Sequence, residues 1–263
     1  LQLLRGRIVK AWQTANATFL LVLLSGILTS IFSLARLITW LLAEHPIPVW
    51  SFFFGLILVS SHLVAREITR WNWTRFACFV LGIAFAWWIT VASPVQWGND
   101  PLSLFMAGAI AICAMILPGI SGSFLLVLMG LYAVVLGAVK TLDIAVLAVF
   151  AAGCLVGILS FARLLSWLLA RWRDLTLAFL VGLMLGSLNK VWPWKQTLTW
   201  RTDSHGQQTP LLQDNLLPAQ FAQLSGQDAQ LWLAILLAVG GVVLVLGLEW
   251  LAGRKQQTPG AIE

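Results

Sequence analysis

The sequence predicts an all-α polytopic membrane protein, built as an inverted-topology repeat that contains a re-entrant helical hairpin. Three features predict it: an apolar composition, a match of the chain to itself, and a Pro-Gly break inside an apolar stretch. Of the 263 residues, 60% are hydrophobic and 10% are charged, and the mean hydropathy is +0.89. A soluble domain has about 25% charged residues. Fifteen tryptophans against one tyrosine fit aromatic belts at the two membrane interfaces.

Apolar stretches near the length that a bilayer requires, about 20 residues, predict about six full transmembrane helices. They cover residues 18–43, 49–65, 74–92, 144–170, 175–188 and 229–251. A broken apolar stretch, 102–139, separates the third helix from the fourth, and we expect it to form the re-entrant hairpin. The polar stretch 189–228 is expected to be a loop outside the membrane.

The chain matches itself without gaps when it is shifted by 127 residues. Residues 31–43 and 158–170 are identical at nine of 13 positions, and Arg36 then meets Arg163. Shared hydrophobicity produces matched leucines, but it does not produce matched arginine, tryptophan and glycine at fixed spacing. The match therefore predicts two repeat copies, 1–100 and 101–263, within one membrane domain.

The two copies are expected to be inverted relative to each other. An odd number of membrane crossings separates the matched helices, whether the broken stretch adds none or two. Inverted copies around a shared site are typical of secondary transporters. Subtracting 127 from Pro118 gives a position before Leu1. The first copy's own break and hairpin are therefore expected upstream of this sequence.

Basic residues predict the orientation in the membrane. Ten of them fall on one predicted side: Arg5, Arg7, Lys10, Arg66, Arg70, Arg75, Arg171, Arg173, Arg254 and Lys255. The short turns 44–48 and 93–101 on the other side have none. The positive-inside rule places the ten-residue side, and the C-terminus with it, in the cytoplasm. The broken stretch then enters the membrane from outside.

The break has the sequence Leu-Pro-Gly-Ile-Ser-Gly-Ser and includes the candidate residues Pro118, Gly119, Ser121, Gly122 and Ser123. Proline and glycine remove helical hydrogen bonds, and lipid cannot satisfy the freed groups, so such a break lies in protein or in a cavity. A helix that restarts here would point its free N–H groups at an anion. The glycines would allow close approach and the serines would donate hydroxyls. The alternative is a kinked helix whose small residues serve packing.

Arg36 and Arg163 occupy equivalent positions, each seven residues before the end of a long apolar stretch. Placing an arginine near the membrane centre costs from ~2.5 to well over 10 kcal/mol, so such residues are usually functional. We expect them to guide or neutralise an anion. The alternative is that both side chains extend along the helix to reach the headgroups.

The sequence shows no pattern typical of a metal site or of a catalytic centre. It has no Asp-rich motif and no Ser-His-Asp arrangement, and His45, His62 and His205 are scattered. The three cysteines lie in apolar stretches without metal-ligand spacing. We therefore expect no metal, no cofactor and no catalytic residue. The net charge of +6 is attributed to membrane topology and not to a nucleic-acid partner.

The break, with Phe124 and the following Gly130-Leu131-Tyr132, resembles the second signature of the bacterial polyprenyl-phosphate transporter family. The resemblance covers essentially the whole chain. It implies an inverted repeat with a Pro-Gly-x-Ser-Gly signature in each half, although only the second signature is present here. It further implies a flippase of the bacterial inner membrane, which returns undecaprenyl phosphate to the inner leaflet for reuse as a carrier lipid.

On this hypothesis the break and the two arginines bind the substrate phosphate. Moving an anion inward opposes a negative-inside potential by about 2.3 kcal/mol per charge per 100 mV, so a coupled proton or sodium ion is expected. Unwound carbonyls near Leu117 and Gly119 are candidate ligands for that ion. Two alternatives stay open, namely a transporter or channel for small soluble anions and a membrane enzyme that modifies polyprenyl phosphates. The oligomeric state is left open.

Overall fold

The computed structural model describes residues 17–92, 95, 97–202 and 208–256. The chain divides into two compact units, the first ending at Val49 and the second beginning at Trp50. In the first unit, helix α2 (Ala17–Glu44) has 28 residues, which at 1.5 Å per residue is long enough to cross a bilayer. The edge of the Trp40 ring meets His45, just beyond the helix end, with the ring centroids 5.7 Å apart.

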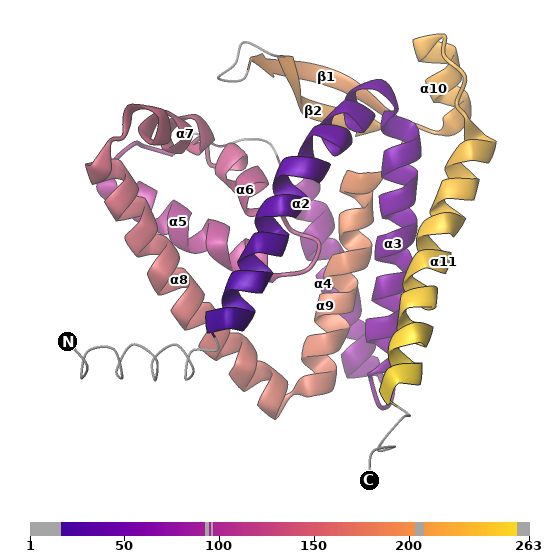
Figure 1. The fold of residues 1–263 in the computed structure, drawn as a ribbon, viewed down its shortest axis with the longest axis horizontal. Coiled ribbons are helices and arrows are strands. Elements are labelled where there is room, and N and C mark those ends of the chain that lie inside the picture. Colours follow the sequence, from indigo (N-terminus) through magenta and orange to yellow (C-terminus); the bar gives the residue numbers. More distant parts are fainter. Residues whose placement is uncertain (1–16, 93–94, 96, 203–207, 257–263) are drawn as a thin grey trace. The chain divides into compact units, whose positions relative to one another are not determined.

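The second unit consists mainly of helices (Figure 1). It holds α3 (Pro46–Arg66) from Trp50 onward, followed by α4 (Trp73–Val91), α5 (Pro101–Ile116), α6 (Gly122–Leu128), α7 (Tyr132–Thr141), α8 (Ile144–Arg171), α9 (Arg173–Val191), β1 (Lys195–Thr202), β2 (Gln208–Asn215), α10 (Pro218–Ser225) and α11 (Leu231–Gln256).

Among the described residues of the second unit, five helices are long and apolar enough to span a membrane: α3, α4, α8, α9 and α11. Their outward surfaces carry large apolar side chains, and Trp73 and Trp232 are 86% and 84% exposed. A water-soluble protein rarely exposes apolar surface on this scale. The predicted class, an all-α polytopic membrane protein, is confirmed.

Helices α4 and α9 run parallel and touch backbone to backbone. A Cβ placed on Gly82 of α4 would collide with the carbonyl oxygen of Phe179, and one on Gly182 of α9 with that of Phe79. Glycine is therefore required on both sides of this contact. Small residues let membrane helices approach closely enough for dispersion forces to hold them together.

Helices α5 and α8 are also parallel, since Gly153 faces the backbone of Phe105 and Gly157 faces that of Ala109. Both helices therefore begin at the same end of the unit. A link of only two residues, 142–143, joins α7 to α8. The segment from α5 to α7 thus enters the unit and returns to the end from which it came, as expected of a re-entrant hairpin.

The second arm of this hairpin differs from the single helix expected from the apolar run after the break. It consists of α6, with seven residues, and α7, which is turned by 108° relative to α6. Gly130 between them has φ +73°, a left-handed conformation that glycine adopts readily. The N–H groups of Val95 and Trp97 donate to the carbonyls of Leu128 and Met129, at 2.6 and 3.0 Å. The bend therefore keeps its backbone hydrogen bonds.

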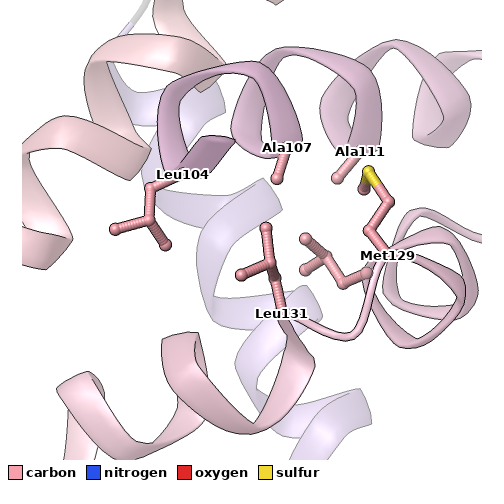
Figure 2. Packing of buried hydrophobic residues seen from close by; sticks show 6 residues of the cluster. Leu104, Ala107, Ala111, Met129 and Leu131 are labelled. Atoms are coloured by element: carbon pink, nitrogen blue, oxygen red, sulfur yellow. The ribbon is translucent and has the colours of Figure 1, made fainter. Parts of the chain in front are cut away.

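A buried apolar cluster fixes the bend against α5. Figure 2 shows Leu104, Ala107 and Ala111 of α5 facing Met129 and Leu131. Leu131 and Ala107 have no exposed surface. The small alanines leave room for the two larger side chains of the link. The hairpin is thus held by packing as well as by hydrogen bonds.

The polar stretch 189–228 contains structure that the sequence did not predict. Strands β1 and β2 form an antiparallel pair in which Lys195 lies opposite Asn215. The short helix α10 follows the pair. The indole N–H of Trp192 donates to Leu216 O, and that of Trp194 donates to Ala229 O, both at 2.8 Å. These bonds fasten the strand pair to the end of α9.

The loops that follow α3 and precede α9 meet at the other end of the unit. Arg173 pairs with Glu67 at 2.5 Å, and Arg75 pairs with Asp174 at 3.1 Å. Thr69 donates a further hydrogen bond to Asp174. Two of the basic clusters used to assign the cytoplasmic side therefore lie together.

The glycine contact between α4 and α9 can be tested by adding one methyl group. Gly182→Ala is expected to lower the free energy of unfolding by about 1–3 kcal/mol, because the new Cβ overpacks the interface. Gly247→Ala in α11 is the control, since nothing lies within 4 Å of a Cβ there. Thermal unfolding of the detergent-purified protein, followed by tryptophan fluorescence, measures both. Equal melting temperatures for the two variants would contradict the assigned contact.

Candidate functional site

The break spans residues 117–121, between α5 and α6. Leu117 is extended, as expected for a residue that precedes proline. Gly119 has φ +88°, which disfavours any residue with a side chain. Ser121 begins α6, and its hydroxyl accepts from the N–H of Phe124 at 3.4 Å and lies 2.9 Å from the hydroxyl of Ser123. Each residue type in the motif thus has a local backbone role.

Gly119 lies directly against α9. A Cβ built on it would lie 2.6 Å from the hydroxyl oxygen of Ser187 and 3.2 Å from the carbonyl oxygen of Leu183. Ser187 itself is buried, and its hydroxyl donates to the carbonyl of Met184. The break is therefore covered by a membrane helix on this side and is not bare to lipid there.

A cavity of about 420 Å³ opens beside the break. Its lining comes from the break and from α3, α4, α6 and α9: Ile57, Ala86, Ile89, Thr90, Gly119, Ile120, Ser121, Phe124, Ser187, Lys190 and Val191. Most of these side chains are apolar. The polar groups are few, and they are hydroxyls and one ammonium. A cavity of this kind suits a ligand that is largely apolar and carries one anionic group.

Lys190 supplies the cationic group of the cavity. Its Nζ lies 4.5 Å from the centroid of the Phe124 ring, which is a cation–π distance. Phe124 belongs to α6, so this contact connects the last turn of α9 to the helix that follows the break. An ionisable residue at the end of a membrane span, facing a cavity, is by default a functional candidate.

A second, more polar pocket of about 250 Å³ adjoins the cavity and shares Thr90 and Lys190 with it. Its lining consists of Trp87, Thr90, Val91, Asn189, Lys190, Lys195, Gln213, Asp214 and Asn215. The amide of Asn189 donates to Thr90 at 2.8 Å, and that of Asn215 donates to Asn189 at 2.6 Å. The strand pair therefore forms one wall of this pocket.

Lys195 adds a second cation to the polar pocket. Its Nζ donates to the carbonyl of Lys190 at 2.7 Å and lies 4.3 Å from the Trp50 ring. Burial, and after it the positive charge of Lys190, lower the pKa of the Lys195 ammonium to about 8. The ammonium is therefore mostly protonated at neutral pH and loses its proton in mildly alkaline solution.

The five candidate residues of the break have different surroundings in the structure. Gly119 and Ser121 line the cavity. Gly122 is buried, and a Cβ on it would collide with the carbonyl of Ala111 in α5. Pro118 and Ser123 are not among the lining residues. The chemistry at the cavity therefore rests on two of the five, and Gly122 closes the hairpin.

Arg163, one of the two arginines predicted to bind substrate, is not among the residues that line the cavity. Arg163 lies exposed on α8, near the level at which α5 ends. Arg36 lies in α2, and its side chain is outside the described residues. Their predicted role in guiding an anion stays a prediction.

Sequence reasoning missed Lys190, Thr90 and Asn189 as parts of a site. In the sequence, Lys190 and Lys195 lie on the predicted side opposite the ten basic residues assigned to the cytoplasm. That departure from the positive-inside rule was the available signal, because a lysine there needs a local reason. No sequence pattern indicates Thr90 and Asn189, because the hydrogen bond between them depends on the packing of α4 against α9.

No three histidine, cysteine, aspartate or glutamate side chains lie close enough to hold a metal ion in the part of the chain that the structure describes.

Comparison with known proteins gives one family. Residues 1–209 match the undecaprenyl phosphate translocase-like family. A polyprenyl-phosphate transporter of Vibrio cholerae is 55% identical over 234 residues, which are 89% of this chain and 76% of that protein. A polyprenyl-phosphate transporter of Staphylococcus aureus is 32% identical over 194 residues, 67% of this chain and 69% of that protein. No solved structure matches the chain. The chain belongs to the undecaprenyl phosphate translocase-like family.

Proposed function

We propose that this protein is a flippase that moves undecaprenyl phosphate across the bacterial cytoplasmic membrane, to the inner leaflet, for reuse as a carrier lipid. One observation carries the proposal: Gly119 and Ser121 of the Pro-Gly break and Lys190 of α9 line the same cavity. The two relatives support the substrate class, because both are named polyprenyl-phosphate transporters.

The cavity matches the chemistry of this lipid. A phosphate accepts charge-assisted hydrogen bonds, and Lys190 and the Ser121 hydroxyl are the donors that line the wall. Ile57, Ile89 and Val191 present apolar surface for the first isoprenyl units. The rest of the isoprenyl chain would remain in the bilayer, so only the phosphate headgroup needs a polar path.

The polar pocket gives the headgroup a path to water. It shares Lys190 with the cavity, and Lys195 lies further along its wall. A headgroup at the mouth would meet Lys195 first and Lys190 second. Two cations along a path attract an anion and reduce the cost of removing it from water.

The charge bias predicts the orientation on which the proposed inward direction of transport rests. Loops with Arg66, Arg70, Arg75, Arg171 and Arg173 are assigned to the cytoplasm by the positive-inside rule. The polar pocket then faces outside. Because inward movement of an anion opposes the membrane potential, a proton or a sodium ion is proposed to move with it. Arg163 is proposed to guide the headgroup further inward.

A leaflet assay tests the function. The protein is reconstituted in vesicles that carry a fluorescent polyprenyl phosphate in one leaflet, and loss of that lipid from the leaflet is followed over time. Movement of chemically unchanged lipid supports the proposal. Uptake of inorganic phosphate without lipid movement would favour a soluble-anion transporter. Altered lipid would favour a membrane enzyme.

Lys190→Met is expected to slow lipid movement by ~10–100-fold, because a charged hydrogen bond to the headgroup is worth about 1.5–3 kcal/mol. Lys140→Met removes an exposed lysine at the end of α7 and serves as the control. The leaflet assay measures both. If Lys190→Met moves lipid at the wild-type rate, Lys190 does not bind the headgroup.

Arg163→Ala is expected to slow lipid movement by ~10-fold while leaving lipid binding intact, because Arg163 lies outside the cavity and would act later on the path. Arg171→Ala, at the exposed end of the same helix, is the control. Transport is read in the leaflet assay and binding by equilibrium titration with the fluorescent lipid. Equal transport by the two variants would remove Arg163 from the mechanism.

The orientation is tested by labelling single cysteines in whole cells. Ser225→Cys lies at the end of α10 and Asn72→Cys in the loop before α4. Both are made in a chain whose three native cysteines are replaced by alanine. A membrane-impermeant maleimide is expected to label position 225 in intact cells and position 72 only after permeabilisation. The reverse result would invert the assigned topology and place the polar pocket on the cytoplasmic side.

A further inference from the structure

Two pairs of helices in this protein make the same contact. In the first pair, a Cβ on Gly182 of α9 would collide with the carbonyl of Phe79 in α4. In the second pair, a Cβ on Gly55 of α3 would collide with the carbonyl of Ala238 in α11. Gly182 and Gly55 are 127 positions apart (182 − 55), which is the shift that relates the two repeat copies.

The glycines of the partner helices, α4 and α11, show the same correspondence. A Cβ on Gly82 of α4 would collide with the carbonyl of Phe179, and one on Gly241 of α11 would lie 2.5 Å from that of Phe52. Phe179 and Phe52 are again 127 positions apart (179 − 52). Gly241 and Gly82 are 159 apart, as are Ala238 and Phe79 (241 − 82 and 238 − 79). Helix α11 is thus the counterpart of α4.

The two shifts differ by 32 residues (159 − 127), so the second copy holds that many extra residues between α9 and α11. The strand pair and α10 lie there. The counterpart helices also run in opposite directions. The ring of Phe54 in α3 lies 5.9 Å from that of Trp192 at the end of α9, whereas Glu67, just after α3, pairs with Arg173 at the start of α9. The glycine contact between α9 and α4 is thus repeated between α3 and α11, with α3 running opposite to α9.

Two lining residues of the polar pocket have counterparts that line another cavity, whereas the counterpart of Lys190 is Leu63, which does not line it. Subtracting 127 from Asn189 gives His62, and adding 159 to Trp87 gives Leu246. His62 and Leu246 both line a cavity of about 600 Å³. Its other lining residues come from α3, α4, α9 and α11 and from Trp71 in the loop before α4. The pair of Asn189 and Thr90 likewise corresponds to His62 and Glu249.

The chemistry of this second cavity fits an anionic lipid. Its walls are mainly apolar, and the cation among its lining residues is Arg66. Arg66 lies 3.9 Å from Glu249, with the two side chains 64% and 49% exposed. An exposed ion pair at that distance contributes little to the stability of the fold. The guanidinium therefore stays able to bind a phosphate. Leu58 and Leu246 offer surface to an isoprenyl chain.

We propose that this cavity is a second headgroup site, at which Arg66 and His62 bind the lipid phosphate on the side opposite the break. The proposal rests on the proposed function, since it takes the same lipid as its ligand. The lipid then has a binding site near each face of the membrane, and transport carries the headgroup from one to the other.

The test maps where the lipid binds. Full-length protein in vesicles is exposed to a polyprenyl phosphate that carries a diazirine on its first isoprenyl unit, and the labelled peptides are identified by mass spectrometry. Labels are expected near the break and also within residues 58–66 of α3. Arg66→Gln is expected to reduce the α3 label by ~5-fold or more and to leave the label at the break unchanged. Lys190→Met is expected to reduce the label at the break and to leave the α3 label unchanged.

Arg70→Gln is the matched control, because Arg70 is exposed at the same end and does not line the cavity. It is expected to change neither label. Label at the break alone would overturn the second site and leave the proposed function standing. Equal α3 labelling by the polyprenol without phosphate would also overturn it, because recognition would then be apolar only. Absence of both labels in the wild type would count against the proposed function itself.

Discussion

In hydrocarbon, every backbone N–H and C=O needs a partner inside the protein, and this requirement governs the structure. The break after α5 frees such groups, and α9 packs over the break and shields it from lipid on that side. Ser187 and Leu183 of α9 lie within van der Waals distance of Gly119. The chain before α5 does the same for the bend after α6, where Val95 and Trp97 donate to freed carbonyls. At both of these places the irregular backbone lies where another segment of the chain reaches it.

Covering the break this closely requires helices that touch through their backbones. Gly82 and Gly182 bring α4 and α9 together, so that Thr90 and Asn189 form a hydrogen bond between the same two helices. Lys190 follows Asn189 and is thereby directed toward the cavity. The packing of two small residues thus determines where the cation lies. Residues that do not line the cavity thus control the position of those that do.

The sequence predicted those features of the fold that depend on composition and on local backbone chemistry. The apolar stretches became helices, and the Pro-Gly break interrupts the chain where it was expected. Helix α2 ends at Glu44 and α8 at Arg171, and the difference of 127 (171 − 44) equals the repeat shift. The inversion of the two copies remains a prediction. The strand pair was missed because no apolar face marks it: KQTLTWRT is polar at most positions.

The candidate site was predicted only in part, for a physical reason. Gly119 and Ser121 carry a local signal, because proline, glycine and serine act on the backbone within a few residues. Lys190, Thr90 and Asn189 come together from α4 and α9, about 100 positions apart, and no pattern within either helix reports it. The bend at Gly130 was missed in the same way, since its stability comes from Leu131 packing against α5.

The strand pair between α9 and α11 has a consequence for how the protein is made. Lys195 and Asn215 bind the end of α9, yet Asn215 is synthesised 24 residues after Val191 (215 − 191). A chain emerging from the ribosome has therefore completed the sequence of α9 before it has made the residues that complete the polar pocket. During that interval the lysines at the pocket lack their final neighbours. Synthesis of a short polar segment after α9 is then the step that completes this pocket.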